Sequence, residues 1–176
     1  GPSKGLLSVG RAGYLPPFLQ KTNHNGVQKN ILIVKGCMGP DLFEGELLEG
    51  YLIKDEKNNK VTLSKEKTSE DASYIQTRYY PIKVFKDRTL VEVELITGKS
   101  HQIRAHMASI GHPLLGDYKY GDVSFNDRFK KRFHINHQLL HACRVMIPAS
   151  KELSLNELLI IESPKPPIFQ RLFDLQ

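Results

Sequence analysis

A continuous run of β-branched and aliphatic residues, Ile31 to Val34, constrains the fold of this chain more than any other segment. The run is closed by Gly36 and lacks the polar alternation of a half-exposed strand, so it predicts a strand buried on both faces. A chain of 176 residues with 40% hydrophobic residues can build one core around such a strand. We therefore expect a single globular domain.

Further strands and a few helices follow from the hydrophobic pattern. Lys57–Lys60 predicts a hairpin turn between strands at Gly50–Lys54 and Val61–Ser64. The other expected strands are Ser73–Val84, Thr89–Ile96, Leu139–Ile147 and Glu157–Glu162, and the other expected helices are Phe18–Lys21, Ser100–Ile110 and Ile168–Leu175. Many strands with a few helices indicate the α+β class.

The helix expected over Ser100–Ile110 has defined ends. The serine hydroxyl at its first position can cap the N-terminus, and Gly111 ends the helix. Ile103 and Met107 fall on one face at helical spacing, whereas Arg104 lies on an adjacent face. The helix therefore presents an apolar face to the core and an arginine beside it.

The charge of the chain limits the expected classes of binding partner, and its cysteines limit the expected metal sites and cellular location. The net charge of +6 and pI near 9.3 favour nucleic acid, an anionic membrane or an acidic partner without choosing among them. The chain has no apolar run long enough to span a membrane. Cys37 and Cys143 lie in apolar stretches without metal-ligand spacing, which predicts two buried reduced thiols, no metal site and a cytoplasmic location.

Three ordered segments are the most specific feature of the chain. They are T-G-K-S-H-Q-I-R-A-H at residues 97–106, G-H-P-L-L-G-D at residues 111–117 followed by Tyr120-Gly121, and Leu140-His141-Ala142. They closely resemble T-G-R-T-H-Q-I-R-V-H, then G-H-P-L-x-G-D and Y-G, then L-H-A, of the RluA-like family of RNA pseudouridine synthases. Ser3–Val9 also resembles the family's T-S-G-L-L-L-V, and Gln28–Gly36 resembles K-x-Y-L-A-x-V-x-G. The resemblance covers nearly the whole chain.

This resemblance implies a fold and an activity. The fold would be the pseudouridine synthase fold, a mixed and largely antiparallel sheet flanked by a few helices, in one catalytic domain over residues 1–176 that is truncated at its N-terminus. The family cleaves the N-glycosidic bond of a uridine in RNA, turns the base and rejoins it through carbon 5, without a metal or organic cofactor. The expected partner is structured RNA, with ribosomal RNA ahead of transfer RNA, and no obligate protein partner is expected.

The resemblance also implies which residues carry the chemistry. The essential aspartate belongs to an H-R-L-D motif that precedes the segment matched by Ser3–Val9, so we expect it just outside this chain. Arg104, by its place in Q-I-R, would pair with that aspartate and hold it ionised, and Leu140 would form the apolar wall of the base pocket. His101 would bond phosphate or stabilise the turn into its helix. Candidates for phosphate contact are Lys99, Lys119, Lys130, Lys131 and Arg132.

One departure from the family pattern leaves alternatives open. Asn30 stands where the family usually has a tyrosine that stacks on the target base. The protein could therefore be an RNA-binding protein that kept the fold and lost the reaction, or a protein-interaction domain without an RNA role. Of the remaining polar residues, Asp117 is expected to fix a loop, and His106 and His112 are expected to be structural.

Overall fold

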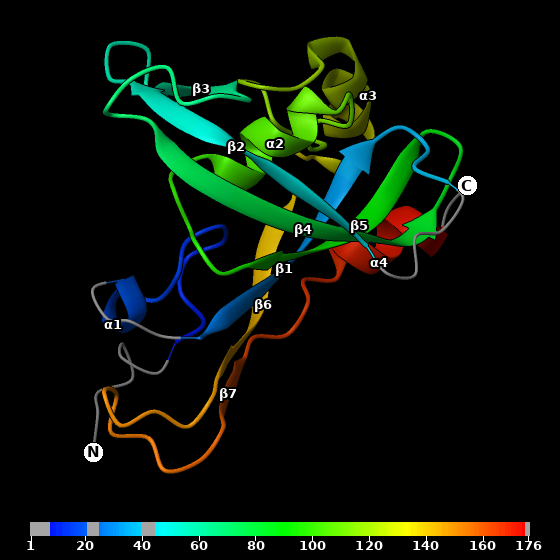
Figure 1. Cartoon of the computed structure of the whole chain (residues 1–176). Coiled ribbons are helices and arrows are strands. Elements are labelled where there is room, and N and C mark those ends of the chain that lie inside the picture. The colour runs from blue at the N-terminus through cyan, green and yellow to red at the C-terminus, as the bar shows by residue number, and fades with distance from the viewer. Residues whose placement is uncertain (1–7, 21–24, 40–44, 175–176) are drawn as a thin grey trace.

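A computed structural model describes residues 8–20, 25–39 and 45–174, and its centre is a twisted seven-stranded sheet (Figure 1). The strands are β1 (Val27–Lys35), β2 (Glu46–Asp55), β3 (Lys60–Ser64), β4 (Ser73–Val84), β5 (Arg88–Leu95), β6 (Leu140–Ile147) and β7 (Leu159–Glu162). Their order in the sheet is β3-β2-β4-β5-β1-β6-β7, and each neighbouring pair is antiparallel. The predicted α+β class is confirmed.

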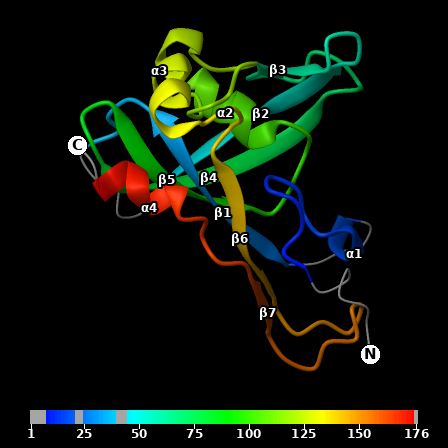
Figure 2. The same cartoon turned by 180° about the vertical axis from the view of Figure 1, so that it is seen from behind.

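Four helices accompany this sheet in the described residues. They are α1 (Pro17–Gln20), α2 (Gln102–Ser109), α3 (Val123–Phe133) and α4 (Ile168–Asp174). Helix α1 and the loop before it lie at one end of the sheet, and α4 lies at the opposite end (Figure 2). One end of the sheet therefore lies next to α1 and its preceding loop, and the other end lies next to α4.

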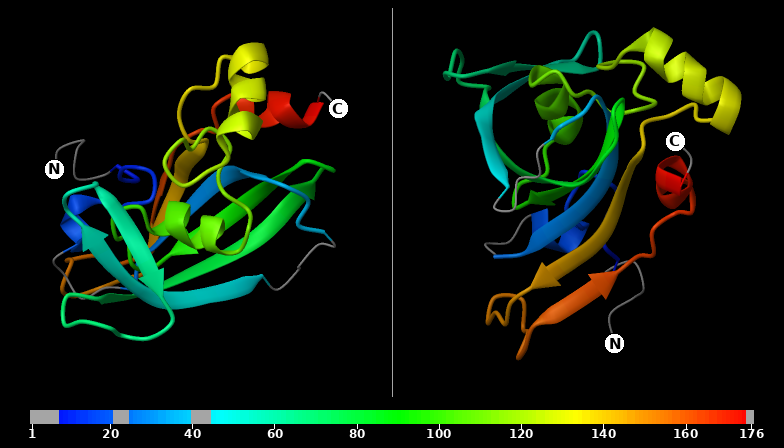
Figure 3. Two further views of the ribbon diagram at one scale, coloured as in Figure 1. Left: turned by 90° about the horizontal axis from the view of Figure 1, so that it is seen from above. Right: turned by 90° about the vertical axis from the view of Figure 1, so that its right-hand side faces the viewer.

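Strand β1 is buried on both faces, as its sequence predicts. Leu32 and Val34 pack in one cluster with Ile103 of α2, which lies in the concave side of the curved sheet (Figure 3). Ile31 and Ile33 belong to a second cluster, formed with the aromatic and aliphatic side chains of α3 and α4. Alternate residues of one strand therefore serve two cores, which explains why the run has no polar position.

Helix α3 was not among the expected elements, because its sequence reads first as a basic stretch. The Asp122 side chain caps it by accepting a hydrogen bond from the Phe125 backbone N–H at 3.0 Å. Phe125 and Phe129, four residues apart, are buried on its inner face. An aspartate followed by aromatic residues at helical spacing is the sequence pattern from which this helix could have been predicted.

The N-terminus of α2 differs from the prediction. The residue at the cap position is His101, in the left-handed conformation with φ 61°, and it makes no side-chain capping bond. The Ser100 hydroxyl instead accepts a hydrogen bond from the Tyr14 hydroxyl at 2.8 Å, so the predicted Ser100 cap is wrong. The predicted end is confirmed, since Gly111 has φ 83° and its N–H donates to the Ala108 carbonyl.

The prediction of two buried thiols is wrong for Cys37 and holds only in part for Cys143. Cys37 is exposed on the turn after β1, because the strand ends at Lys35, before this residue. Cys143 is half-buried and donates to the Lys29 carbonyl at 3.3 Å. The described residues contain no cluster of three metal-ligating side chains. None of the described helices has the length and apolarity needed to cross a membrane.

Arg88 joins the end of the sheet to α4, and its loss should be costly. It is 6% exposed, its Nε and Nη2 atoms donate to the Leu172 carbonyl, and its guanidinium lies 4.9 Å from the Phe85 ring centroid. We expect Arg88→Met to lower the free energy of unfolding by about 3 kcal/mol, because the buried carbonyl loses its donors. Urea denaturation measures this, and the exposed Arg171→Met on α4 should cost under about 1 kcal/mol. Equal losses in the two variants would contradict this role.

Candidate active site

A cavity of about 310 Å³ lies where the N-terminal loop, the first turn of α2 and the start of β6 meet. Its walls are residues 11–14, residues 101–104, Gln138 and Leu140. The fold thus places Arg104, Leu140 and His101, which come from distant parts of the sequence, around one space. The size is within the range of ligand pockets, roughly 300–1,000 Å³.

Arg104 is held by a carboxylate of this chain. Its Nε atom donates to Oδ2 of Asp117 at 2.7 Å, and its Nη2 atom donates to Oδ1 at 3.0 Å. Asp117 is fully buried, which by itself would raise the pKa of its carboxyl, but the bonds from Arg104 and two backbone N–H groups hold that pKa below its ordinary value. A guanidinium has five N–H donors, so about three remain beyond this pair.

Asp117 also fixes the loop that contains it, as predicted. Its Oδ1 atom accepts from the backbone N–H groups of Lys119 and Tyr120 at 2.9 and 3.0 Å. The side chain of Asn126 bonds to the Asp117 carbonyl and to the Gly116 N–H at 2.8 and 2.9 Å, which ties the loop to α3. The loop and Arg104 are therefore positioned by the same carboxylate.

His101 is bonded to Tyr120, a residue without a predicted role. The Tyr120 hydroxyl accepts from the Val61 N–H at 2.8 Å and shares a hydrogen bond with Nδ1 of His101, also at 2.8 Å. Burial lowers the pKa of His101, and the positive charges of Arg104 and Lys119 lower it further. His101 is therefore neutral at pH 7. Its position at the turn fits the predicted turn role, and phosphate contact stays a prediction.

Gln102 fixes the turn before α2, and the sequence interpretation gave it no role. Its side chain is 1% exposed; Oε1 accepts from the Lys99 N–H at 3.1 Å, and Nε2 donates to the Gln76 carbonyl at 2.8 Å and to Thr77 Oγ1 at 3.1 Å. The amide thereby attaches the turn to β4. The sequence could have indicated a role for Gln102 only through its place in the H-Q-I-R segment.

Asn30 forms part of the scaffold behind the cavity. Both Asn30 and Gln28 are fully buried on β1, and the Asn30 side chain donates to Gln28 Oε1 and accepts from the Gly13 N–H, each at 3.0 Å. Gln28 Nε2 in turn donates to the carbonyls of Val9, Arg11 and Tyr14. The asparagine therefore supports the N-terminal loop and has its side-chain hydrogen bonds within the protein.

None of the predicted phosphate-binding cations is among the residues that line the cavity. Lys119 lines an adjoining hollow that shares Arg104 and Gln138 with the cavity, and its Nζ donates to the Asn59 carbonyl at 2.6 Å. Lys99 is exposed on the turn before α2. Lys130, Lys131 and Arg132 are exposed in the last turn of α3.

His106, behind the cavity on α2, should make stability depend on pH. It is 1% exposed, its Nδ1 atom bonds to Thr77 Oγ1 at 2.5 Å, and burial lowers its pKa to about 4. The unfolded chain binds this proton near pH 6.5 and the folded chain only near pH 4. The free energy of unfolding should therefore fall by up to about 3 kcal/mol as the pH drops from 6.5 to 4.

Urea denaturation of His106→Asn between pH 7 and pH 4 tests this dependence. The variant should lose less stability over that range than the unmodified protein does. His134→Asn, at an exposed left-handed cap position where asparagine is tolerated, should keep the original pH dependence. If the curves for His106→Asn and the unmodified protein are parallel, His106 is not the group that titrates.

Comparison with known proteins finds sequence similarity to RNA pseudouridine synthases. The model of the RNA pseudouridylate synthase family matches residues 19–109. The chain is 34% identical to the uncharacterized RNA pseudouridine synthase YlyB of Bacillus subtilis (strain 168) over 142 residues, which are 80% of this chain and 42% of that relative. It is 35% identical to the ribosomal large subunit pseudouridine synthase C of Vibrio cholerae over 111 residues, 62% of this chain and 33% of that relative.

Solved structures show the same fold. The human RNA pseudouridylate synthase domain containing 1 superposes with a TM-score of 0.61 at 20% identity, covering 82% of this chain and 57% of that one. This chain spans less than half the length of the two bacterial relatives. The family model nevertheless matches more than half of the chain, and its residues include the whole turn and helix that carry Arg104. The chain therefore belongs to the RNA pseudouridylate synthase family.

Proposed function

We propose that the full-length protein isomerises uridine to pseudouridine in structured RNA, with ribosomal RNA as its first candidate substrate. The observation that carries this proposal is the cavity in which Arg104, fixed by Asp117, lies beside Leu140. A fixed arginine with free N–H donors at an apolar wall suits the pairing of a second carboxylate that must stay ionised. Ribosomal RNA is favoured because relatives in Vibrio cholerae and Blochmanniella floridana are named ribosomal large subunit pseudouridine synthases.

Each residue at the cavity would have a distinct part in the reaction. The catalytic aspartate would come from a segment that precedes Gly1 in the full-length protein, and Arg104 would hold it ionised. Leu140 would keep water away from that carboxylate, and His101 would contact a phosphate of the RNA. The uridine would leave its stack to enter the cavity. No cofactor is needed, because the base leaves carbon 1 of the ribose through one ring atom and returns through another.

The test is nucleoside analysis of RNA incubated with the full-length protein. Bulk ribosomal RNA that lacks pseudouridine should gain a nucleoside of unchanged mass that separates from uridine by chromatography. Transfer RNA serves as the comparison substrate, and gain in transfer RNA alone would replace ribosomal RNA as the substrate. Absence of the new nucleoside from all RNAs that the protein binds would refute the isomerase.

Asn30 is the observation that favours a second candidate, an RNA-binding protein without the reaction. In this fold the residue supports the N-terminal loop by buried hydrogen bonds, so it supplies no aromatic ring to a bound base. Such a protein would bind RNA with an affinity that falls steeply as salt rises, and would form no pseudouridine. The nucleoside analysis separates the two candidates.

A further inference from the structure

We infer that Arg11 is an anion-binding residue at the cavity and contacts a phosphodiester of the RNA next to the nucleotide that enters it. The inference rests on the proposed function and adds a positively charged residue that the sequence comparison did not single out. It starts from the balance of charge among the residues that line the cavity. Those residues include two arginines, one histidine and no carboxylate.

The other two basic groups of the cavity have no positive charge available to an RNA phosphate. Arg104 is paired with the buried Asp117 through two hydrogen bonds, and under the proposed function its remaining N–H donors pair with the catalytic aspartate. Burial and neighbouring cations lower the pKa of His101, so the imidazole is neutral at pH 7. Arg11 is exposed, and in the described part of the chain it has no carboxylate partner and no side-chain hydrogen bond. Arg11 is therefore the basic residue of the cavity wall that has no carboxylate partner among the described residues and no part in the proposed reaction.

The backbone of the loop that contains Arg11 is fixed by hydrogen bonds from the Gln28 side chain on β1. Gln28 Nε2 donates to the carbonyls on both sides of the loop, those of Val9 and Tyr14, and to the Arg11 carbonyl itself at 3.3 Å. The Tyr14 N–H closes the turn by donating to the Arg11 carbonyl at 2.8 Å. Gly10 and Gly13 have positive φ values of 86° and 80°, which let the chain turn on either side of Arg11. These bonds and turns give the loop one defined backbone conformation, and Arg11 extends from a fixed position in it.

The side chain of Arg11 is oriented as well. Its guanidinium carbon lies 4.0 Å from the centroid of the Tyr14 ring, and the Tyr14 hydroxyl is bonded to Ser100 Oγ at 2.8 Å. A guanidinium that contacts an aromatic ring with its face does not use its N–H groups in that contact. These donors, which lie in the plane of the guanidinium, therefore stay free for an anion. Because the ring is fixed at its hydroxyl end, binding an anion here costs less side-chain entropy than binding at a mobile surface arginine.

RNA phosphodiester is the anion that suits this place. When a nucleotide leaves the stack and enters the cavity, its backbone phosphate moves with it. A single guanidinium beside the cavity can bind that phosphate through two N–H donors. The exposed cations Lys99 and Lys119 lie on the turn before α2 and in the adjoining hollow, so a backbone that passes the cavity mouth meets positive charge on several sides. Arg11 is the member of this set that lines the cavity itself.

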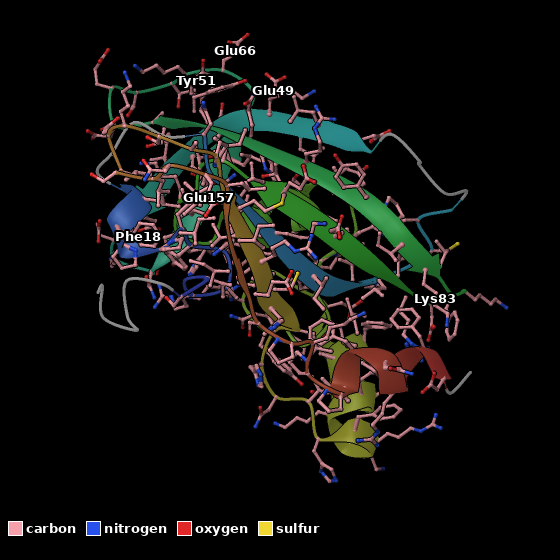
Figure 4. The ribbon with its side chains drawn as sticks, turned by 90° about the horizontal axis from the view of Figure 1, so that it is seen from below. Phe18, Glu49, Tyr51, Glu66, Lys83 and Glu157 are labelled. Atoms are coloured by element: carbon pink, nitrogen blue, oxygen red, sulfur yellow. The ribbon has the colours of Figure 1, made fainter. Side chains whose placement is uncertain are left out.

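The experiment compares Arg11→Ala, Arg11→Lys and Lys86→Ala in the full-length protein. Lys86 is an exposed cation in the turn before β5, three residues after Lys83 in the sequence. Lys83 and Phe18 of α1 lie at opposite ends of the sheet (Figure 4). Affinity for RNA is measured over a series of salt concentrations, and isomerisation is measured at saturating and at low RNA. Thermal melting of each variant shows that it is folded.

We expect Arg11→Ala to bind RNA about tenfold more weakly, because it loses a hydrogen bond between charged groups. The slope of log affinity against log salt should become shallower by about 0.7 to 0.9, the value for one phosphate contact. KM should rise while kcat stays within about twofold, since the contact exists before and during the reaction. Arg11→Lys should keep the salt slope and lose part of the affinity, and Lys86→Ala should match the unmodified protein.

Four results would overturn this inference, the proposed function or both. If Arg11→Ala keeps the original affinity and salt slope while the protein remains an active isomerase, Arg11 contacts no phosphate and the proposed function stands. If Arg11→Ala lowers kcat without changing the salt slope, the residue acts on the reaction and not on the backbone. If the unmodified protein binds RNA and the slope depends on Arg11 but no pseudouridine forms, the proposed function fails and the phosphate contact stands. An unmodified protein that binds no RNA would refute both.

Discussion

Replacing Arg104 with methionine in the full-length protein is expected to lower the rate constant of uridine isomerisation by about 10²–10³-fold, the usual effect of removing one hydrogen-bond donor that stabilises charge in an active site. Methionine fills a similar volume without a charge. The catalytic aspartate would lose the cation that keeps it ionised in an apolar cavity. Single-turnover measurement at saturating RNA gives the effect on the chemical step separately from the effect on RNA binding.

The same variant should also be less stable, and a second variant separates the two effects. Arg104→Met leaves the buried Asp117 carboxylate without its partner, which should reduce the free energy of unfolding by about 3 kcal/mol. Asp117→Asn breaks the same pair and should lose similar stability, but it keeps the guanidinium at the cavity. Its rate constant should therefore exceed that of Arg104→Met by at least about tenfold. Equal rate constants would show that Arg104 acts only through the fold.

The second large effect is expected at Gly116, where alanine should cost roughly 4 kcal/mol of stability. Gly116 has φ 87°, and a Cβ atom there would lie 2.0 Å from the His137 carbonyl oxygen. The left-handed conformation costs an alanine about 1–2 kcal/mol, and displacement of a packed backbone adds about 1–3 kcal/mol. The displacement would reach Asp117, the next residue, and through it Arg104. In a protein of this size the melting temperature should fall by roughly 8–16 °C.

Gly111→Ala is the matched control for this prediction. Gly111 has nearly the same backbone conformation, with φ 83°, but a Cβ atom there would meet no atom within 4 Å. Its substitution should cost only the conformational part, about 1–2 kcal/mol. Differential scanning calorimetry of both variants measures the difference. Equal decreases in melting temperature would show that the close approach of His137 does not restrict this loop.

The sequence predicted the elements whose formation depends on local pattern. Strand β4 has the predicted bounds, Ser73–Val84. Two strands also pair across the predicted hairpin turn, although β2 begins at Glu46, before the predicted Gly50, and β3 begins at Lys60, which was expected in the turn. In each case alternation or a turn sequence determines the structure over a few residues. Helix α3 was missed because its basic residues dominate the segment, although Asp122 and the buried Phe125 and Phe129 define its start and its inner face.

The contacts that build the site were less accessible to sequence, because they join residues far apart in the chain. Arg104 and Leu140 could be named from the family resemblance, and both line the cavity. The hydrogen bonds of Asn30 to Gly13 and of Gln28 to the N-terminal loop depend on how β1 packs against residues 9–14. The stacking of Arg11 on Tyr14 depends in turn on that loop. No periodicity in the sequence encodes such long-range polar contacts.

The central claim, that the full-length protein is a pseudouridine synthase that uses Arg104, is tested most directly by tritium release. RNA labelled with tritium at carbon 5 of uridine loses that tritium to water when carbon 5 becomes the point of attachment to ribose. The unmodified protein should release one tritium for each pseudouridine formed, and Arg104→Met should release it at least about a hundredfold more slowly. RNA binding by the unmodified protein without tritium release would contradict the claim and would identify an RNA-binding protein that has the fold without the reaction.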